Sequence, residues 1–486
     1  MLHPPKKHIY QLFFVGALLA LHIPFLQADA DINITSSRAA WTDEGIYSLQ
    51  IRNWLNGFGF SIVETDAFLR TPLFNISVLP FYFLFGIHLW VVRWLVLTIT
   101  LITAWFLLHK QFIGQWTWPF LVYLLLNFQL FQHCHLGLAE VPAICLILLS
   151  LLLYKQNVAT SKISYLPYIG MLIAAGYKIS FAFAPAIFFL LQFSMWLFAS
   201  KEHKLLHQHM LYRSLLVNII GSIIFLSCWY WPNQDFIRHI LSIQTEVSLS
   251  TQLETNWLKL KSNYEWYAAQ PHFKVMFYLF KLNMVGLVIL GLIRKRIVFS
   301  NENLILLIFS ILWLLFEAGK FANNYLPSRY LLSAIAANLL LLFVMADLFI
   351  QNTHHRKYAI LFSTFAGVML FLPSIYNSYV HRSFQLAHLN TYLAKTIIDN
   401  KYPVMGNWAA SCTWECKVAL KPLSSGVHNH IETLKLHHPQ LVITEPDEAD
   451  SDKLFERQSV NLKQVADSVV TTNVAHWNLN LYWLSR

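Results

Sequence analysis

Residues 90–108 read WVVRWLVLTITLITAWFLL, and this stretch decides the fold class. It carries a single charge, Arg93, near its start. A helix of about 20 apolar residues crosses the hydrocarbon core of a bilayer, which is roughly 30 Å thick. Ten further apolar segments bring the prediction to about eleven transmembrane helices, at 10–28, 117–133, 141–154, 164–177, 180–199, 214–231, 273–293, 303–317, 330–350 and 358–376.

The composition of the whole chain agrees with this interpretation. Of its 486 residues, 56% are hydrophobic and only 12% are charged. Soluble domains usually carry about 25% charged residues, and disordered chains are poor in hydrophobic residues. The composition therefore excludes an ordinary soluble enzyme and a disordered chain, and it predicts a polytopic α-helical membrane protein.

The apolar segment 72–88 differs from the others because it contains Pro72 and Pro80 and is interrupted by Gly86. We interpret it as an interfacial or re-entrant helix within a first outer loop of about 29–89. The alternative is a twelfth transmembrane helix.

The distribution of charge predicts the orientation. With the N-terminus inside, the short inner loops hold 13 basic residues and three acidic ones, whereas basic and acidic residues balance in the outer loops and in the tail. Basic residues favour the cytoplasmic side of a membrane. The net charge of +10 is therefore a topology signal, and we expect no nucleic-acid partner.

The orientation divides the chain into two predicted parts. Residues 1–377 form a transmembrane domain with a cytoplasmic N-terminus, and residues 378–486 form a small extracytoplasmic α/β domain. Lys6, Lys7 and the segment Ala28-Asp29-Ala30 resemble a signal peptide. We favour an uncleaved first helix, because the topology holds with that helix retained. The expected location is the bacterial inner membrane.

Two of the five cysteines, Cys412 and Cys416, lie close together in the tail. They form a disulfide if the tail lies in an oxidising compartment. The alternative, two free thiols, is equally compatible with the sequence.

An acidic pair, Asp43 and Glu44, lies early in the first outer loop. A helix over 43–55 places Asp43 at its N-terminus, where the helix dipole keeps a carboxylate ionised. An ionised carboxylate can accept a proton from a hydroxyl nucleophile. The alternative is that Asp43 is only an N-cap.

Further charged residues gather at the same predicted membrane face. Arg70 opens the interfacial helix, and Glu140 begins a transmembrane helix after His133 and His135. Lys178, Lys320 and Arg329 are three more cations at that face. Four cations beside Asp43 and Glu140 suit a phosphate group held at headgroup depth with a base nearby. Each cation alone is also explained as an anchor to lipid headgroups. The two histidines are a weak metal signal because no third ligand is defined.

The order of these motifs resembles the GT-C superfamily of integral-membrane glycosyltransferases, and most closely its protein O-mannosyltransferase-like and aminoarabinose-transferase-like branch. The resemblance covers about residues 8–377. The matching motifs are Asp43-Glu44-x-x-Tyr47, Arg70-Thr71-Pro72-Leu73 before Phe85-Gly86, Val92-Arg93, Glu140-Val141-Pro142, Tyr177-Lys178 and Tyr325-Leu326-Pro327-Ser328-Arg329-Tyr330.

The resemblance implies a transferase that takes its sugar from a polyprenyl-phosphate-linked donor, with a protein, lipid A or glycan hydroxyl as acceptor. It implies Asp43 as the base. If Asp43 removes the acceptor proton and the sugar is displaced in one step, the reaction inverts the anomeric carbon, and we predict inversion on that ground. We predict three groups of site residues: catalytic Asp43, Glu44 and Glu140; donor-phosphate-binding Arg70, Lys178, Lys320 and Arg329; and substrate-binding Tyr47, Tyr325 and Tyr330. Glu140 occupies a position where the family more often has Asp. No cofactor is required, and a divalent metal is possible but not indicated.

Several other functions remain open. A lipid or polysaccharide transporter, or flippase, predicts polar groups deep within helices and a two-fold repeat. The sequence has few mid-helix charges and no evident repeat. A ligase or polymerase of lipid-linked glycans and a receptor-like scaffold are further alternatives. A nucleotide-sugar donor is disfavoured because no cytoplasmic loop is long enough to fold a nucleotide-binding domain.

Overall fold

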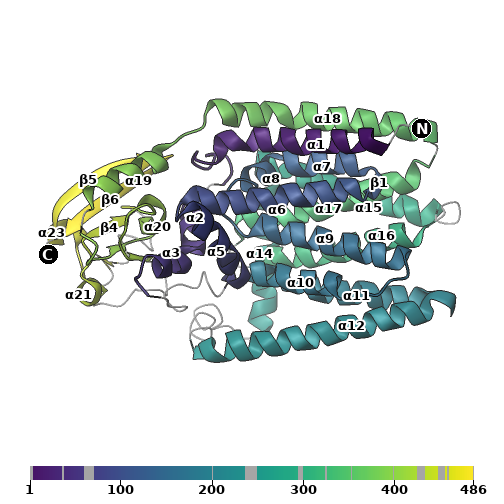
Figure 1. Ribbon diagram of the computed structural model, residues 1–486, viewed down its shortest axis with the longest axis horizontal. Coiled ribbons are helices and arrows are strands. Elements are labelled where there is room, and N and C mark those ends of the chain that lie inside the picture. The colour runs from purple at the N-terminus through teal and green to yellow at the C-terminus, as the bar shows by residue number, and fades with distance from the viewer. Residues whose placement is uncertain are drawn as a thin grey trace.

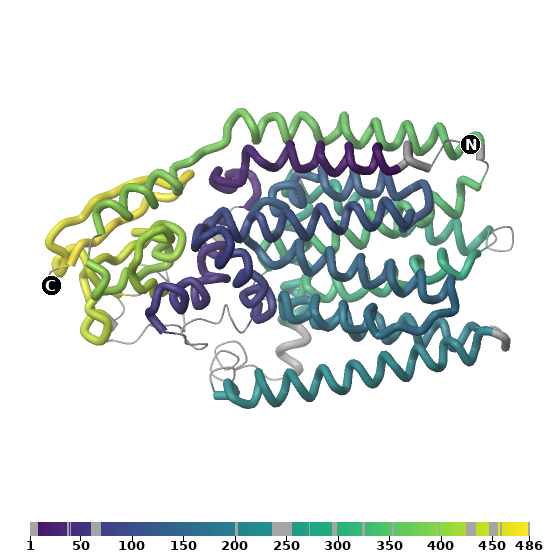
Figure 2. Tube along the Cα trace, viewed as in Figure 1, coloured from purple at the N-terminus to yellow at the C-terminus, as the bar shows by residue number. Residues whose placement is uncertain are grey.

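The structure is a computed structural model, in which a bundle of long helices carries a small mixed α/β region at one end (Figures 1 and 2). It describes residues 4–35, 38–59, 70–199, 201–235, 249–293, 299–322, 326–351, 353–397, 399–423, 433–446, 455–456 and 459–484. Among these residues, nine helical segments are long and apolar enough to cross a membrane. They coincide with nine of the eleven predicted spans and confirm a polytopic helical membrane protein.

The helices of the bundle are α1 (Pro4–His22), α6 (Leu89–His109), α7 (Thr117–Leu126), α8 (Phe128–His133), α9 (Glu140–Ala159), α10 (Leu166–Tyr177), α11 (Phe183–Phe198), α12 (Lys201–Phe225), α14 (Leu249–Ala269), α15 (Pro271–Ile293), α16 (Asn301–Gly319), α17 (Leu332–Phe349) and α18 (Thr353–Val380). A short strand, β1 (Phe112–Gln115), follows α6.

Two predicted spans are shorter helices than expected. The segment 117–133 is divided into α7 and α8 at Asn127, whose backbone is not helical (ψ 128°) and whose side chain accepts a hydrogen bond from the N–H of Gln129. The segment 164–177 contains only the 12 residues of α10, because Lys178 continues in an extended conformation (φ −152°, ψ 121°). The proline-containing segment is α5 (Pro72–Phe85), with 14 residues, which is below spanning length as expected.

Helices α17 and α9 form the centre of the bundle. Of their apolar windows, 83% and 72% are buried, compared with 6% for the span that contains α12. Lipid tails are as apolar as leucine, so an outer helix exposes apolar side chains to the bilayer at no cost. The buried centre therefore consists of α9, which begins at Glu140, and α17, which begins three residues after Arg329.

The C-terminal region is built on a five-stranded sheet of order β3-β2-β4-β6-β5. Strands β2 (Val404–Met405), β3 (Leu420–Lys421) and β4 (Leu441–Thr444) are parallel, whereas β6 (Trp477–Leu484) pairs antiparallel with β4 and with β5 (Ala466–Val474). The helices of this region are α19 (Gln385–Thr396), α20 (Ala409–Cys412), α21 (Thr433–His437) and α23 (Leu462–Val465). This mixed sheet with short helices confirms the predicted small α/β fold.

The first loop lies between the sheet region and the bundle, as helices α2 (Ala39–Tyr47), α3 (Leu49–Leu55) and α5 (Figure 1). On α3, the buried Arg52 donates hydrogen bonds to the carbonyls of Trp414, Cys416 and Val418. Burial lowers the pKa of Arg52 to about 10, so its guanidinium remains charged at neutral pH. Asp29 accepts hydrogen bonds from two N–H groups at the start of α19. These contacts fix the loop to the C-terminal region.

Candidate functional site

Helix α2 carries the predicted base, but it differs from the predicted helix. It begins at Ala39, four residues before Asp43, and ends at Tyr47, and the non-helical Ser48 separates it from α3. The expectation of one helix over 43–55 with Asp43 at its N-terminus is therefore wrong. Asp43 lies in the middle of α2, so it is not an N-cap.

The carboxylate of Asp43 joins a cluster of buried charges. It forms an ion pair with Arg329, whose Nε also donates to Oε1 of Glu140 at 3.1 Å. Oε1 of Glu140 lies 3.2 Å from Nζ of Lys178, which in turn donates a hydrogen bond to the hydroxyl of Tyr47. The structure thus brings together four of the predicted charged residues and one predicted tyrosine.

Burial within this cluster is uneven. Glu140 is fully buried and Lys178 is 1% exposed, whereas the side chain of Asp43 is 21% exposed. Burial also raises the pKa of Tyr47, so its hydroxyl stays protonated. Two acids and two bases make the cluster neutral overall. Asp43 is therefore the more accessible of the two carboxylates, and a second molecule can approach it. The buried Glu140 pairs with both cations.

Tyr330 lies beside both cations. Its ring centroid is 5.4 Å from Nζ of Lys178 and 5.3 Å from the guanidinium carbon of Arg329. An aromatic face at this distance attracts a cation and limits where it can move. Tyr330 and Tyr47 therefore orient the cations of the cluster.

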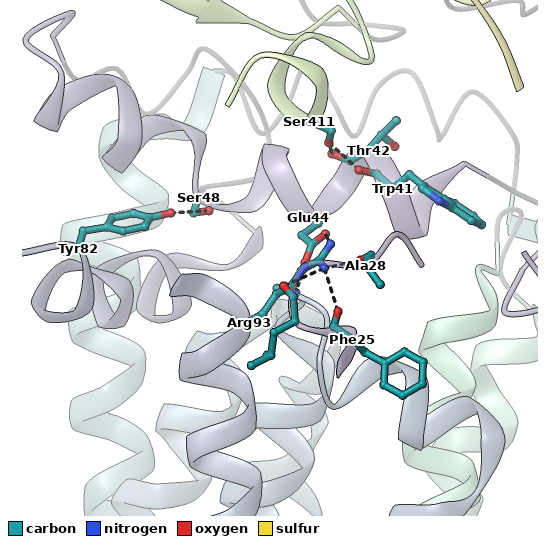
Figure 3. Close-up of polar contacts among 11 residues, drawn as sticks. Phe25, Ala28, Trp41, Thr42, Glu44, Ser48, Tyr82, Arg93 and Ser411 are labelled. Carbon is teal, nitrogen blue, oxygen red and sulfur yellow. Dashed lines mark hydrogen bonds and ion pairs between the residues drawn. The ribbon is translucent and has the colours of Figure 1, made fainter. Parts of the chain in front are cut away.

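Glu44 points toward Arg93, on the side of the bundle (Figure 3). Its two carboxylate oxygens pair with Arg93 at 2.6 and 2.7 Å, and Oε1 also accepts from the N–H of Gly137 at 2.6 Å. Arg93 further donates to the carbonyls of Phe25, Leu26 and Ala28, after the end of α1. Arg93 was quoted as part of a motif but was not among the predicted site residues, although one arginine in the apolar stretch 90–108 indicates a buried partner.

Lys320 belongs to a neighbouring group of residues. Its Nζ contacts Glu317 at 2.8 Å and Ser333 at 2.8 Å, and it donates to the carbonyl of Tyr330 at 3.2 Å. Among the described residues, Lys320 therefore lies next to the backbone of Tyr330, and the carboxylate of Glu317 balances the charge of Lys320.

The remaining predicted residues are placed less fully. Arg70 is half-buried and lies two residues before α5. Tyr325 lies outside the described residues. Within the ranges that the structure describes, no group of three or more His, Cys, Asp or Glu side chains is arranged to hold a metal ion. Cys412 and Cys416 are buried free thiols.

Comparison with solved structures identifies the fold. The chain superimposes on the crystal structure of ArnT from Cupriavidus metallidurans bound to undecaprenyl phosphate, with a TM-score of 0.58 and 13% identity over 97% of this chain and 98% of that one. It also matches the apo state of the same protein, with a TM-score of 0.50 and 10% identity over 98% of both chains. No protein-family model and no curated protein sequence matches. The likeness shows that the chain shares the fold of ArnT, in agreement with the fold that the resemblance implied.

Proposed function

We propose that the chain is a glycosyltransferase that moves a sugar from a polyprenyl-phosphate-linked donor to an acceptor hydroxyl at the outer face of a bacterial inner membrane. The observation that carries the proposal is the position of Arg329, between the partly exposed Asp43 and the buried Glu140. The fold shared with an ArnT structure that binds undecaprenyl phosphate supports a donor of this class.

The charges of the cluster suit the transfer step. The acceptor hydroxyl gives its proton to Asp43 while its oxygen bonds to the anomeric carbon. The bond between that carbon and the phosphate oxygen breaks, and its electron pair stays on the phosphate. Fixed cations stabilise a developing negative charge without reorganising, and Lys178 and Arg329 are the cations of this cluster. A single displacement of this kind inverts the anomeric carbon.

Arg329 links donor binding to Asp43. A phosphate oxygen competes with the Asp43 carboxylate for the guanidinium, because both are anions that pair well with arginine. When the phosphate takes Arg329, the Asp43 carboxylate loses this ion pair and can accept a hydrogen bond from the acceptor hydroxyl instead. Glu140 remains paired with Lys178 and Arg329 and keeps them in place.

The other predicted residues receive narrower roles. We assign Glu44 to positioning, because both of its oxygens are engaged by Arg93. Lys320 supports the backbone of Tyr330, because its ammonium group donates to that carbonyl while Glu317 balances its charge. Arg70 and Tyr325 stay as proposed contacts to the donor phosphate and the substrate. We also propose that the chain divides into a transmembrane domain of residues 1–377 and a domain of residues 378–486, and that the site lies on the extracytoplasmic side.

The test uses purified protein in lipid nanodiscs. Polyprenyl phosphates that carry radiolabelled mannose or aminoarabinose are supplied with membranes of the source cells as acceptor. Asp43→Asn is expected to lower transfer by about 10²–10⁴-fold, the range typical of a lost general base. Binding of undecaprenyl phosphate should remain. Asp347→Asn is the matched control, because Asp347 pairs with Arg356 near the opposite end of α17.

Two results would contradict the proposal. Normal transfer by Asp43→Asn would remove Asp43 from the reaction. An NMR analysis of the product that found the donor configuration retained would exclude the single displacement.

Arg329→Lys offers a finer test, because one ammonium group lacks the fork that reaches two carboxylates. We expect this variant to bind undecaprenyl phosphate more weakly than the wild type.

A further inference from the structure

The side of α2 that faces away from the charged cluster is covered by the C-terminal region. Asp43 and Tyr47 are four residues apart and share the face that meets Arg329 and Lys178. Trp41 and Gly45 are also four residues apart and lie on the opposite face. That opposite face packs against α20. The C-terminal region therefore contacts the base helix directly, within one turn of Asp43.

The hydrogen bonds at this contact are specific. The buried hydroxyl of Ser411 donates to the carbonyl of Trp41 at 2.5 Å and lies 3.3 Å from the carbonyl of Thr42, as Figure 3 shows. Asn390 of α19 donates in turn to the carbonyl of Ser411. The two carbonyls that Ser411 approaches belong to the residues immediately before Asp43.

Gly45 allows the close approach. A Cβ atom at position 45 would lie 2.9 Å from the backbone carbonyl carbon of Ala410 and 2.9 Å from Oγ of Ser411. Contacts below 3.0 Å do not occur for real Cβ atoms, so a larger residue forces α2 and α20 apart. The glycine is explained by this packing, since its backbone is helical.

From these contacts we infer that Ser411, Gly45 and α20 position Asp43 for proton transfer, which makes the C-terminal region a part of the catalytic site. Glu44 and Arg93 hold α2 from the bundle side, and α20 holds it from the other. With both sides fixed, rotation of α2 about its axis is blocked and Asp43 stays directed at Arg329. The inference rests on the proposed function for its catalytic meaning only.

The test compares three variants: Gly45→Ala, Ser411→Ala and the matched control Gly16→Ala. Gly16 is also a helical glycine, but a Cβ there meets nothing within 4 Å. We expect Gly45→Ala to lower kcat about tenfold or more, because misplacing a catalytic group by about 1 Å costs up to about 10²-fold. The KM for the radiolabelled donor should change less than kcat, since Glu140 still pairs with Lys178 and Arg329. Gly16→Ala should match the wild type.

A second readout does not depend on activity. Hydrogen exchange of the peptide that covers 39–47 is measured by mass spectrometry in the full-length protein. Ser411→Ala removes one oxygen atom and should fold, and we expect it to speed exchange in this peptide but not in α6 or α9. Unchanged exchange and unchanged kcat in Ser411→Ala would overturn the inference, as would a rise in KM with an unchanged kcat.

The two readouts separate this inference from the proposed function. If the wild type transfers no sugar but Ser411→Ala speeds exchange in 39–47, the proposed function fails and the support of α2 by α20 stands. If the wild type transfers sugar, and Gly45→Ala and Ser411→Ala transfer it as fast as the wild type with normal hydrogen exchange, only the positioning role fails.

Discussion

Replacing Arg93 by Met is expected to destabilise the protein strongly. Arg93 is 4% exposed and donates to both oxygens of Glu44 and to three carbonyls after the end of α1. Without it, the carboxylate of Glu44, which is 1% exposed, keeps the N–H of Gly137 as its hydrogen-bond donor among the described residues. Breaking a buried ion pair from one side costs about 3–5 kcal/mol, because a buried charge is left uncompensated.

The assay is thermal unfolding in nanodiscs, with a double-mutant cycle. Arg93→Met, Glu44→Gln and the double variant are compared with the wild type. The double variant should be less destabilised than the sum of the single ones by about 0.5–3 kcal/mol, because the second change removes the unpaired charge. Lys261→Met is the control, since Lys261 forms an exposed ion pair with Glu265 that is worth about 1 kcal/mol or less.

Two outcomes would refute this reasoning. Additive effects of the two single variants would show that Glu44 and Arg93 do not stabilise each other. A Glu44→Gln variant with a normal melting temperature and no sugar transfer would show that Glu44 takes part in the transfer reaction. We expect the reverse, namely a lower melting temperature with transfer per folded molecule retained.

Three further predictions concern the C-terminal region. Asp29→Ala removes the side chain that accepts from the first N–H groups of α19, so the melting temperature should fall by the equivalent of about 1 kcal/mol. Gly406→Ala should abolish accumulation in membranes, measured by immunoblot, because Gly406 has φ 128° and a Cβ there would lie 1.9 Å from the carbonyl oxygen of Ile443. Burial raises the pKa of Cys416 to about 11. Its thiol should therefore resist iodoacetamide at pH 8 and react only as the pH approaches 11 or after unfolding, followed by peptide mass spectrometry.

The helical bundle was predictable because apolar length is a local property of the sequence. The exceptions have local causes as well. Asn127 divides one predicted span with a side-chain cap, and the extended backbone at Lys178 shortens another. Asparagine is a common helix N-cap, so this break was readable in principle.

The charged residues of the site were predictable from the sequence, but the residues with which each of them pairs were not. Asp43, Glu140, Lys178 and Arg329 were expected at one face, and the structure joins them in one cluster. Glu44 was grouped with Asp43 because the two are adjacent, yet successive residues of a helix point in directions about 100° apart. That geometry places Glu44 against Arg93.

The contacts with the C-terminal region had no sequence signal. Ser411 and Arg52 are ordinary residues in polar segments, and only the fold brings them to α2 and to the 414–418 segment. Contacts between residues several hundred positions apart depend on the tertiary structure, and local sequence patterns do not predict them.

The hydrogen bond between Ser411 and Trp41 also bears on how the protein is made. Its two residues are separated by 370 positions, and the bond from Arg52 to Trp414 spans 362. Contacts this distant in sequence form late, since the chain between them must be in place first. During synthesis, α2 emerges early but lacks the surface that supports it until about 370 further residues have been translated. The helix that carries Asp43 is therefore present long before the contacts that position it, and α2 gains support on both sides only after α20 has been made.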